Sequence, residues 1–167
     1  MKLITGATTA DGRRGDLFIV DGRFADPADA PGGIERFDAD GLLALPGLVD
    51  LHTHLREPGR EDAETVATGT EAAARGGFTC VHAMANTDPV TDTAEAAEYL
   101  AELGEREGHC QVVPVGAVTK GLAGEELAEL GLMAGSRARV RVFSDDGRCV
   151  FDSLLMRRAL TYVKPFG

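Results

Sequence analysis

From residue 45 onward, two kinds of segment alternate along the chain, and they differ in how their apolar and polar positions are arranged. Short, mostly apolar runs predict strands, and longer runs with an apolar stripe of helical period predict helices. The predicted strands cover 47–54, 78–86, 110–118 and 138–144, and the predicted helices cover 61–77, 93–107, 124–133 and 151–164. Strands that alternate with helices indicate a parallel sheet with helical crossovers. The pattern therefore predicts an α/β fold with four βα units, which fits either an open doubly wound sheet or part of a (β/α)8 barrel.

Local signals place the ends of two of these helices. Asp62 is a suitable cap for the helix over 61–77, and the Gly76-Gly77 pair is suited to end it. For the last helix, Asp152 or Ser153 can serve as the cap, and Pro165 should stop it.

The first 44 residues follow a different pattern. Their apolar runs are short, and Asp-Gly pairs separate them, which is typical of tight turns. The stretch "LFIVDGRF" (17–24) predicts a β-hairpin. Residues 1–44 are therefore expected to form the strands of a small β-domain, separate from a main domain over 45–167.

Composition narrows the choice of partners. The formal net charge of −10 argues against nucleic acid or an anionic membrane as a partner, so an anionic ligand would need a local attraction from a metal or an arginine.

No apolar run approaches the ~18 residues of a membrane span, and no signal peptide is evident, so a cytoplasmic protein is expected. The three widely spaced cysteines fit reduced thiols, most simply as small core residues.

Polar side chains follow all four predicted strands. In a parallel βα sheet, functional groups gather where strands end and loops begin. The residues at these ends are His52, His54 and Arg56, then Asn86, then Thr119 and Lys120, and finally Asp145 and Asp146.

The two histidines have the spacing of a metal site. His52 and His54 lie at i and i+2, so an extended strand directs both imidazoles to the same face, where they can bind one ion such as Zn²⁺. A carboxylate of Asp145 or Asp146 would complete or bridge that site. The plain alternatives are two hydrogen-bonded histidines and a simple Asp-Asp-Gly turn.

Arg56 and Asn86 are candidates for substrate binding. The planar guanidinium of Arg56 fits a carboxylate with two parallel hydrogen bonds, although it can also pair with Glu57 or Glu61 at the surface. Asn86 offers both a donor and an acceptor, although it is also a good turn residue.

Three other candidates are left outside the site. His82 lies in mid-strand, where a core role is expected, and His109 lies at the opposite end of its strand. Lys120, which could in principle bridge metals as a carbamate, is interpreted as a loop lysine.

Five blocks together carry a family resemblance: "LPGLVDLHTHLREPG", "ATGTEAAARGGFTCV", "MANTDPV", "TKGLAGEELAELG" and "FSDDGRCV". In order and spacing they resemble the bacterial dihydroorotases of the amidohydrolase superfamily. The first block is shared with allantoinases and hydantoinases, so "FSDDG" is the discriminating one. The hydantoinase and allantoinase branches usually carry a lysine at the end of the fourth strand, where this sequence has aspartate.

The resemblance implies roles for the site residues. His52 and His54 become ligands of zinc, with one or two ions bound, and Asp146 becomes a ligand or bridge, with Asp145 as the fallback. Arg56 and Asn86 become the groups that bind the carboxylate of a small anionic substrate, and His54 is expected to contact the substrate as well as the metal. The implied reaction is the reversible cyclisation of N-carbamoyl-L-aspartate to L-dihydroorotate in pyrimidine synthesis.

The resemblance also implies an incomplete barrel. A (β/α)8 barrel needs about 250 residues, so residues 45–167 correspond to its first four βα units, and 1–44 to part of the family's small β-domain. Further histidine ligands and the aspartate general base are expected beyond Gly167, so the chain alone is expected to be inactive. Alternatives are a non-catalytic half-barrel and another cyclic amidohydrolase. Expected partners are further copies of the chain, or aspartate carbamoyltransferase as in some relatives.

Overall fold

A computed structural model describes residues 1–166, which form two compact units. The first is Met1–Pro46, and the second begins at Gly47. No helix among residues 1–166 is long and apolar enough to cross a membrane.

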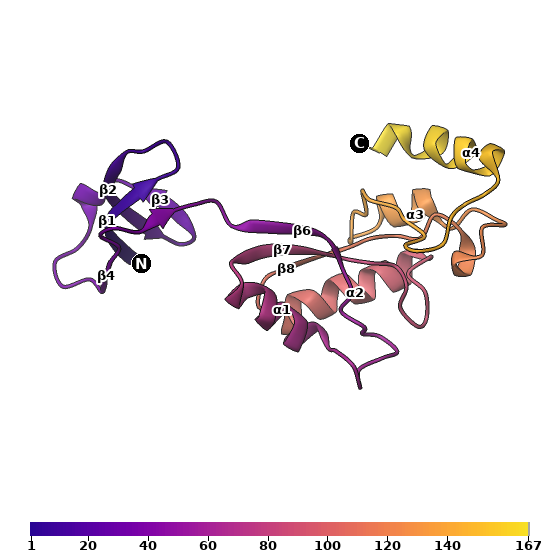
Figure 1. The fold of residues 1–167 in the computed structure, drawn as a ribbon, viewed down its shortest axis with the longest axis horizontal. Helices are drawn as coiled ribbons and strands as arrows, with labels where there is room; N and C mark the ends of the chain where they lie inside the picture. Colours follow the sequence, from indigo (N-terminus) through magenta and orange to yellow (C-terminus); the bar gives the residue numbers. More distant parts are fainter. Residues whose placement is uncertain (167) are drawn as a thin grey trace. The chain divides into compact units, whose positions relative to one another are not determined.

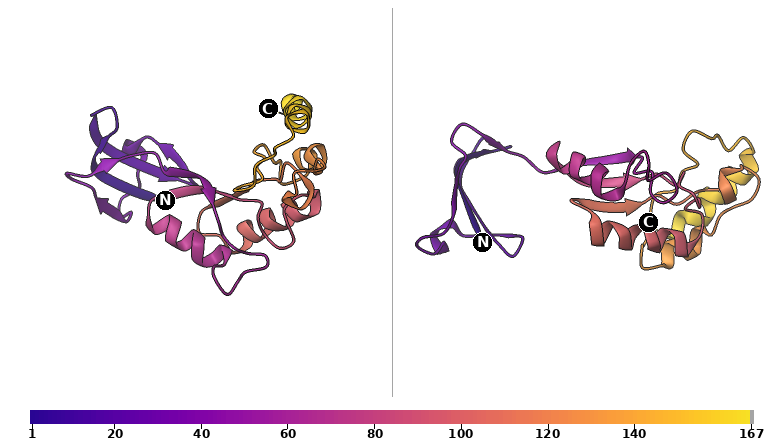
Figure 2. Two further views of the ribbon diagram at one scale, coloured as in Figure 1. Left: turned by 45° about the vertical axis from the view of Figure 1, so that its right-hand side comes forward. Right: turned by 90° about the horizontal axis from the view of Figure 1, so that it is seen from below.

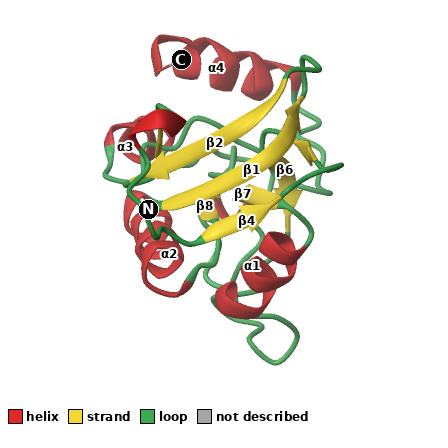
Figure 3. Cartoon of the chain, turned by 90° about the vertical axis from the view of Figure 1, so that its left-hand side faces the viewer, coloured by secondary structure: helices red, strands yellow, loops and turns green. Residues whose placement is uncertain are grey.

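The first unit is a five-stranded sheet. Its central strand β1 pairs antiparallel with β2 and parallel with both β4 and β5, and β2 pairs antiparallel with β3. Figure 3 shows β2, β1 and β4 side by side. The strands are β1 (Lys2–Thr9), β2 (Arg14–Val20), β3 (Arg23–Ala25), β4 (Arg36–Asp38) and β5 (Leu43–Ala44), with a short 3-10 helix at Pro27–Asp29.

The β2–β3 hairpin confirms the prediction from "LFIVDGRF". Val20 pairs with Arg23 across a two-residue turn in which Asp21 and Gly22 have φ angles of 48° and 73°. A positive φ at both positions is the requirement of a type I′ turn, which Asp-Gly meets at little cost.

The second unit contains a three-stranded parallel sheet in the order β6-β7-β8. Its strands are β6 (Leu48–Thr53), β7 (Phe78–Ala83) and β8 (Gln111–Pro114), and its helices are α1 (Val66–Arg75), α2 (Ala94–Glu107), α3 (Leu130–Gly135) and α4 (Ser153–Val163), with 3-10 turns at Lys120–Leu122 and Lys164–Phe166. Helices α1 and α2 lie along one face of the sheet (Figure 1; also the left view of Figure 2).

A buried apolar cluster joins these two helices to the sheet. Each fully buried side chain of this kind contributes roughly 1.5–3 kcal/mol. Gly104 allows α2 to approach β8, because a Cβ atom there would lie 2.5 Å from Cβ of Val112. The cluster consists of Leu55, Val66, Val81, Ala83, Leu100, Leu103 and Val112.

The fourth predicted strand is not formed as a regular strand. Its segment makes only an isolated parallel bridge, between Gly116 and Phe143. The bridge rests on hydrogen bonds from Gly116 N to Val142 O (3.0 Å) and from Ser144 N to Gly116 O (2.9 Å). Strand β8 already ends at Pro114, so this segment pairs with the loop beyond it. Its direction is nevertheless parallel, as the βα pattern predicts.

Helix α1 begins later than predicted, because a stronger cap overrides Asp62. Thr65 and Thr68 form a reciprocal capping box, with the Thr65 hydroxyl accepting from Thr68 N at 3.1 Å. The Glu57 carboxylate also accepts from Val66 N, at 2.8 Å. Residues 61–64 are therefore loop, and the helix starts at Val66.

Of the two C-terminal helices, α3 differs from expectation, whereas α4 confirms the predicted cap. Residues 124–129 are not helical, because they form other hydrogen bonds, such as Ala128 N to Val118 O (3.0 Å). Helix α3 therefore starts at Leu130. The cap of α4 is Asp152, which accepts from Leu154 N at 2.8 Å. Pro165 lies in the 3-10 turn that follows α4.

Candidate metal centre

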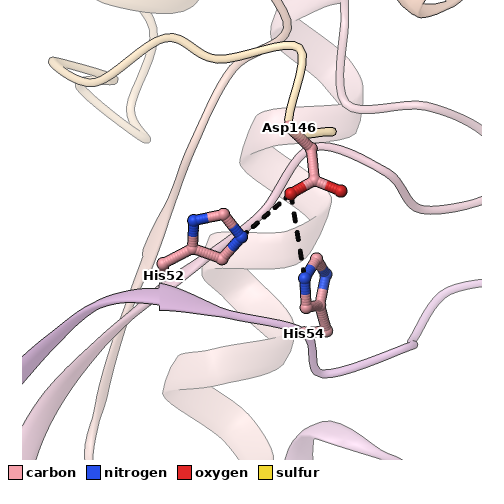
Figure 4. A group of neighbouring side chains, drawn as sticks. All are labelled: His52, His54 and Asp146. Atoms are coloured by element: carbon pink, nitrogen blue, oxygen red, sulfur yellow. Dashed lines mark ion pairs between the residues drawn. The ribbon is translucent and has the colours of Figure 1, made fainter. Parts of the chain in front are cut away.

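Three side chains from two distant parts of the second unit converge on one point (Figure 4). His52 is in β6, His54 follows one residue after that strand ends, and Asp146 follows the Gly116–Phe143 bridge. His52 Nε2 lies 2.9 Å from Asp146 Oδ1, and His54 Nε2 lies 3.8 Å from the same oxygen. The ligand atoms of all three residues lie within 4.8 Å of one another.

The geometry and chemistry of this set fit a metal ion. Two ligands at ~2.0–2.1 Å from a tetrahedral Zn²⁺ are separated by roughly 3.3 Å, and the two distances to Asp146 Oδ1 bracket that value. The exposed fractions of the side chains are 58% for His52, 28% for His54 and 18% for Asp146. Two imidazoles and one carboxylate therefore form a partly buried triad that an ion can reach.

The structure separates the roles of the two adjacent aspartates. Asp145 is 5% exposed and does not belong to the group of ligand atoms formed by His52, His54 and Asp146. Its carboxylate accepts from Val118 N (2.7 Å), from Thr119 N (3.0 Å) and from the Thr119 hydroxyl. These contacts bind the loop after β8 to the loop that carries Asp146. Asp145 thus has a structural role, and the fallback of Asp145 as the ligand is not what the geometry favours.

The backbone at Asp146 aims its side chain at the histidines. Its φ of 54° lies in the left-handed region, which aspartate tolerates better than most residues. Asp146 N donates to the Ser144 hydroxyl at 3.0 Å. With Asp145 anchored on one side and this hydrogen bond on the other, the carboxylate has a defined orientation.

Asn86 lies between two members of the triad. Its Oδ1 is 3.0 Å from His54 Nδ1, and its Nδ2 donates to Asp146 Oδ2 at 2.8 Å. The sequence placed Asn86 in the site as a substrate-binding group, and the structure brings it to the site through contacts with the histidine and the aspartate.

Arg56 is exposed and lies on the same loop as His54. Its backbone has a φ of 62°, and its carbonyl accepts from Arg60 N at 2.8 Å. Within residues 1–166 the Arg56 guanidinium forms no ion pair. The alternative of pairing with Glu57 or Glu61 is not realised, because Glu57 caps α1 and Glu61 accepts from Gly59 N, a contact that lowers the pKa of Glu61.

The residues left outside the site are not part of the group formed by His52, His54 and Asp146. Lys120 pairs with Glu126 at 2.8 Å on the surface, as expected of a loop lysine. His109 donates its backbone N–H to the Thr70 hydroxyl. His82 has a buried Nδ1 without a hydrogen-bond partner among residues 1–166.

Residue patterns alone left two features of the site open. The pair "DD" does not by itself distinguish the buried aspartate from the one that faces the histidines, and only the family resemblance favoured Asp146. The contact of Asn86 with Asp146 joins residues 60 positions apart, which no local spacing reveals. The position of Asn86 at a strand end and the family resemblance pointed toward the site, but not to this contact.

The sequence profile of the family described as Dihydro-orotase-like matches residues 41–164. A dihydroorotase of Leifsonia xyli subsp. xyli is 65% identical over 166 residues, and one of Mycobacterium tuberculosis is 51% identical over 160. These alignments cover 98% and 94% of this chain but 38% and 37% of the relatives. The chain thus spans little more than a third of the relatives it matches.

Solved structures resemble the chain in fold. A D-hydantoinase structure, 25% identical, matches 99% of this chain and 38% of its own with a TM-score of 0.74. A dihydropyrimidinase from Brevibacillus agri, 21% identical, matches the same shares with the same TM-score. The family match, the relatives and the fold agree: this chain belongs to the dihydroorotase-like family.

Proposed function

We propose that this chain carries a metal-binding and substrate-anchoring part of a dihydroorotase, which interconverts N-carbamoyl-L-aspartate and L-dihydroorotate. The observation that carries the proposal is the convergence of His52, His54 and Asp146 in a chain of the dihydroorotase-like family. Relatives named dihydroorotase at 51–65% identity support it. We further propose that β6, β7, β8 and the segment around Phe143 are the first four strands of a (β/α)8 barrel, with residues 1–44 in a small β-domain.

We assign the metal to three atoms: Nε2 of His52, Nε2 of His54 and Oδ1 of Asp146. Imidazole nitrogen with carboxylate oxygen is a donor set that suits Zn²⁺, in one-ion or two-ion centres. A bound Zn²⁺ supplies Lewis acidity at the reacting carbonyl group. The histidines and the carboxylate fix where that ion lies relative to the substrate.

Arg56 is the proposed anchor for the α-carboxylate of the substrate. It is an exposed residue on the loop that carries His54, and its guanidinium forms no ion pair with the residues that the structure describes, 1–166. In a chain with a net charge of −10, an anionic substrate needs such a local cation. The left-handed backbone at Arg56 is consistent with a functional position, since such conformations cluster at ligand-binding sites.

The residues of this chain bind and orient the substrate for ring closure. In that direction the carbamoyl NH2 nitrogen attacks the side-chain carboxyl carbon, so a C–N bond forms and a C–O bond breaks. The departing oxygen leaves as water, with one proton from the attacking nitrogen and one from solvent. The attack is intramolecular within the substrate, and holding the α-carboxylate at Arg56 and the reacting carboxyl beside the triad would orient the two reacting groups. By the family resemblance, we expect the general base to lie outside this chain.

Metal content after dialysis tests the ligand assignment. The doubled variant His52→Ala, His54→Ala should lose the bound zinc, because only Asp146 of the triad remains. His109→Ala is the matched control, since His109 lies at the opposite strand end, and it should keep the parent's zinc content. A doubled variant that retains as much zinc as the parent would show that the ligands are assigned wrongly.

Another cyclic amidohydrolase activity is the second candidate. The structural similarity to proteins titled D-hydantoinase and dihydropyrimidinase favours it. The aspartate at position 146 disfavours it, because the hydantoinase branch is expected to have a lysine at the end of the fourth strand. A full-length enzyme that carries this sequence should turn over N-carbamoyl-L-aspartate and not hydantoin, and the opposite preference would establish the second candidate.

A further inference from the structure

The amide of Asn86 contacts both His54 and Asp146. Its oxygen can only accept a hydrogen bond, and its nitrogen can only donate one. An ionised carboxylate accepts hydrogen bonds and cannot donate them. The Asn86 group that faces Asp146 Oδ2 at 2.8 Å must therefore be the amide nitrogen. This contact orients the whole amide, because a flipped amide would place its oxygen against the carboxylate.

The orientation of the amide determines the tautomer of His54. With Nδ2 directed at Asp146, the amide oxygen faces His54 Nδ1 at 3.0 Å. An oxygen acceptor at that distance requires a hydrogen on Nδ1. In a neutral imidazole, Nε2 is then the nitrogen with the free lone pair. Nε2 is also the atom that lies 3.8 Å from Asp146 Oδ1 and faces the proposed ion.

Asn86 also gives the two carboxylate oxygens of Asp146 different roles. Oδ2 accepts from the Asn86 amide, whereas Oδ1 faces the histidines, 2.9 Å from His52 Nε2. One side chain thus selects Nε2 of His54 and Oδ1 of Asp146 as the atoms that remain free for metal.

The backbone around Asn86 keeps the amide in place. The two preceding residues, Met84 and Ala85, are 3% and 0% exposed. Met84 N donates to Thr53 O in β6 at 2.9 Å, and Thr91 N donates to Ala85 O at 3.0 Å. Asn86 is therefore attached to the strand that carries His52 and held in its loop by buried neighbours.

We infer that Asn86 is a positioning residue of the metal centre, which presents His54 through Nε2 and Asp146 through Oδ1. The inference rests on the proposed metal centre and adds to the predicted role of Asn86 in substrate binding. One N–H and one lone pair of the amide remain for a substrate, so the two roles are compatible.

Metal affinity separates positioning from substrate anchoring. The 167-residue chain would be titrated with Zn²⁺ alone against a competing chelator. Asn86→Leu removes both hydrogen bonds at similar volume and should weaken zinc binding about 10- to 100-fold, the usual effect of losing a group that orients a metal ligand. Arg56→Met, which removes the proposed substrate anchor without touching the triad, should leave zinc affinity unchanged. Equal affinity of Asn86→Leu and the parent would overturn the inference.

Two further measurements keep the result unambiguous. Thr87→Val removes a hydroxyl that donates to Pro89 O in the same loop, and equal weakening by this variant would assign the effect to the loop and overturn the role of the amide. Nitrogen NMR of the metal-free parent reads the His54 tautomer directly, even if Asn86→Leu fails to fold. A hydrogen on Nδ1 supports the inference, and one on Nε2 refutes it. A parent without zinc affinity would instead refute the proposed metal centre, and this inference with it.

Discussion

The clearest quantitative prediction concerns Asp145 and Asp146, which are adjacent in the chain and opposite in role. The perturbation is to replace each aspartate with alanine and compare the stability of the second unit. Asp145 should be the residue on which the fold depends, whereas Asp146 should be dispensable for folding and essential for metal binding.

The magnitude follows from what each substitution leaves behind. Asp145→Ala leaves Val118 N, Thr119 N and the Thr119 hydroxyl without their acceptor, and Thr119 is 0% exposed. A buried donor without a partner costs about 1–3 kcal/mol. The hydroxyl can rotate toward another acceptor, so the two N–H groups set an expected loss of about 2–6 kcal/mol in the free energy of unfolding. That is a large fraction of the stability of a typical domain, which is about 5–15 kcal/mol.

Two other substitutions should lower the free energy of unfolding by less than Asp145→Ala. Asp145→Asn keeps one oxygen for the two N–H groups and should cost less, about 1–2 kcal/mol. Asp146→Ala loses contacts with an exposed histidine and with Asn86 at a partly open site, so less than about 1 kcal/mol is expected. Only Asp146→Ala should lose the additional stability that zinc gives the parent.

Urea unfolding followed by tyrosine fluorescence suits this comparison. The chain has no tryptophan, and its two tyrosines, Tyr99 and Tyr162, are both in the second unit. The signal therefore reports that unit alone. A larger loss of stability in Asp146→Ala than in Asp145→Ala would refute the assignment of the structural and ligating roles.

Three further predictions follow from the surface and the thiols. In a full-length enzyme with this sequence, Arg56→Met should weaken binding of N-carbamoyl-L-aspartate by ~2–5 kcal/mol without unfolding it, as steady-state kinetics and circular dichroism would show, and unchanged kinetics would exclude the anchor role. Burial raises the pKa of Cys80 and Cys110, so less thiolate is present at pH 8 and a disulfide reagent should label the exposed Cys149 first; simultaneous labelling would contradict the burial. Leu51 on the edge strand β6 is 67% exposed, so the 167-residue chain should associate on a sizing column. Leu51→Lys should reduce that association, and a parent that elutes as a monomer would refute the prediction.

The sequence by itself determined the order of the elements and most candidate residues. Helix α2 and the β2–β3 hairpin followed from local signals: a run over 93–107 with a helical pattern, and an Asp-Gly turn between apolar strands. The i, i+2 spacing of His52 and His54 gave their shared direction, because the period of a strand is local. Family resemblance, carried by short motifs, supplied the roles.

The tertiary structure decided what depends on residues far apart in the chain. Asp145 and Asp146 have the same chemistry, and only the contact of Asp145 with Thr119, 26 positions away, shows which one is buried. The amide of Asn86 links His54 to Asp146 across 60 positions. The fourth predicted strand did not form as a regular strand for the same reason. Its partner is the loop at Gly116, not a regular strand. Strand pairing is a non-local interaction, and the apolar pattern of 138–144 does not encode it.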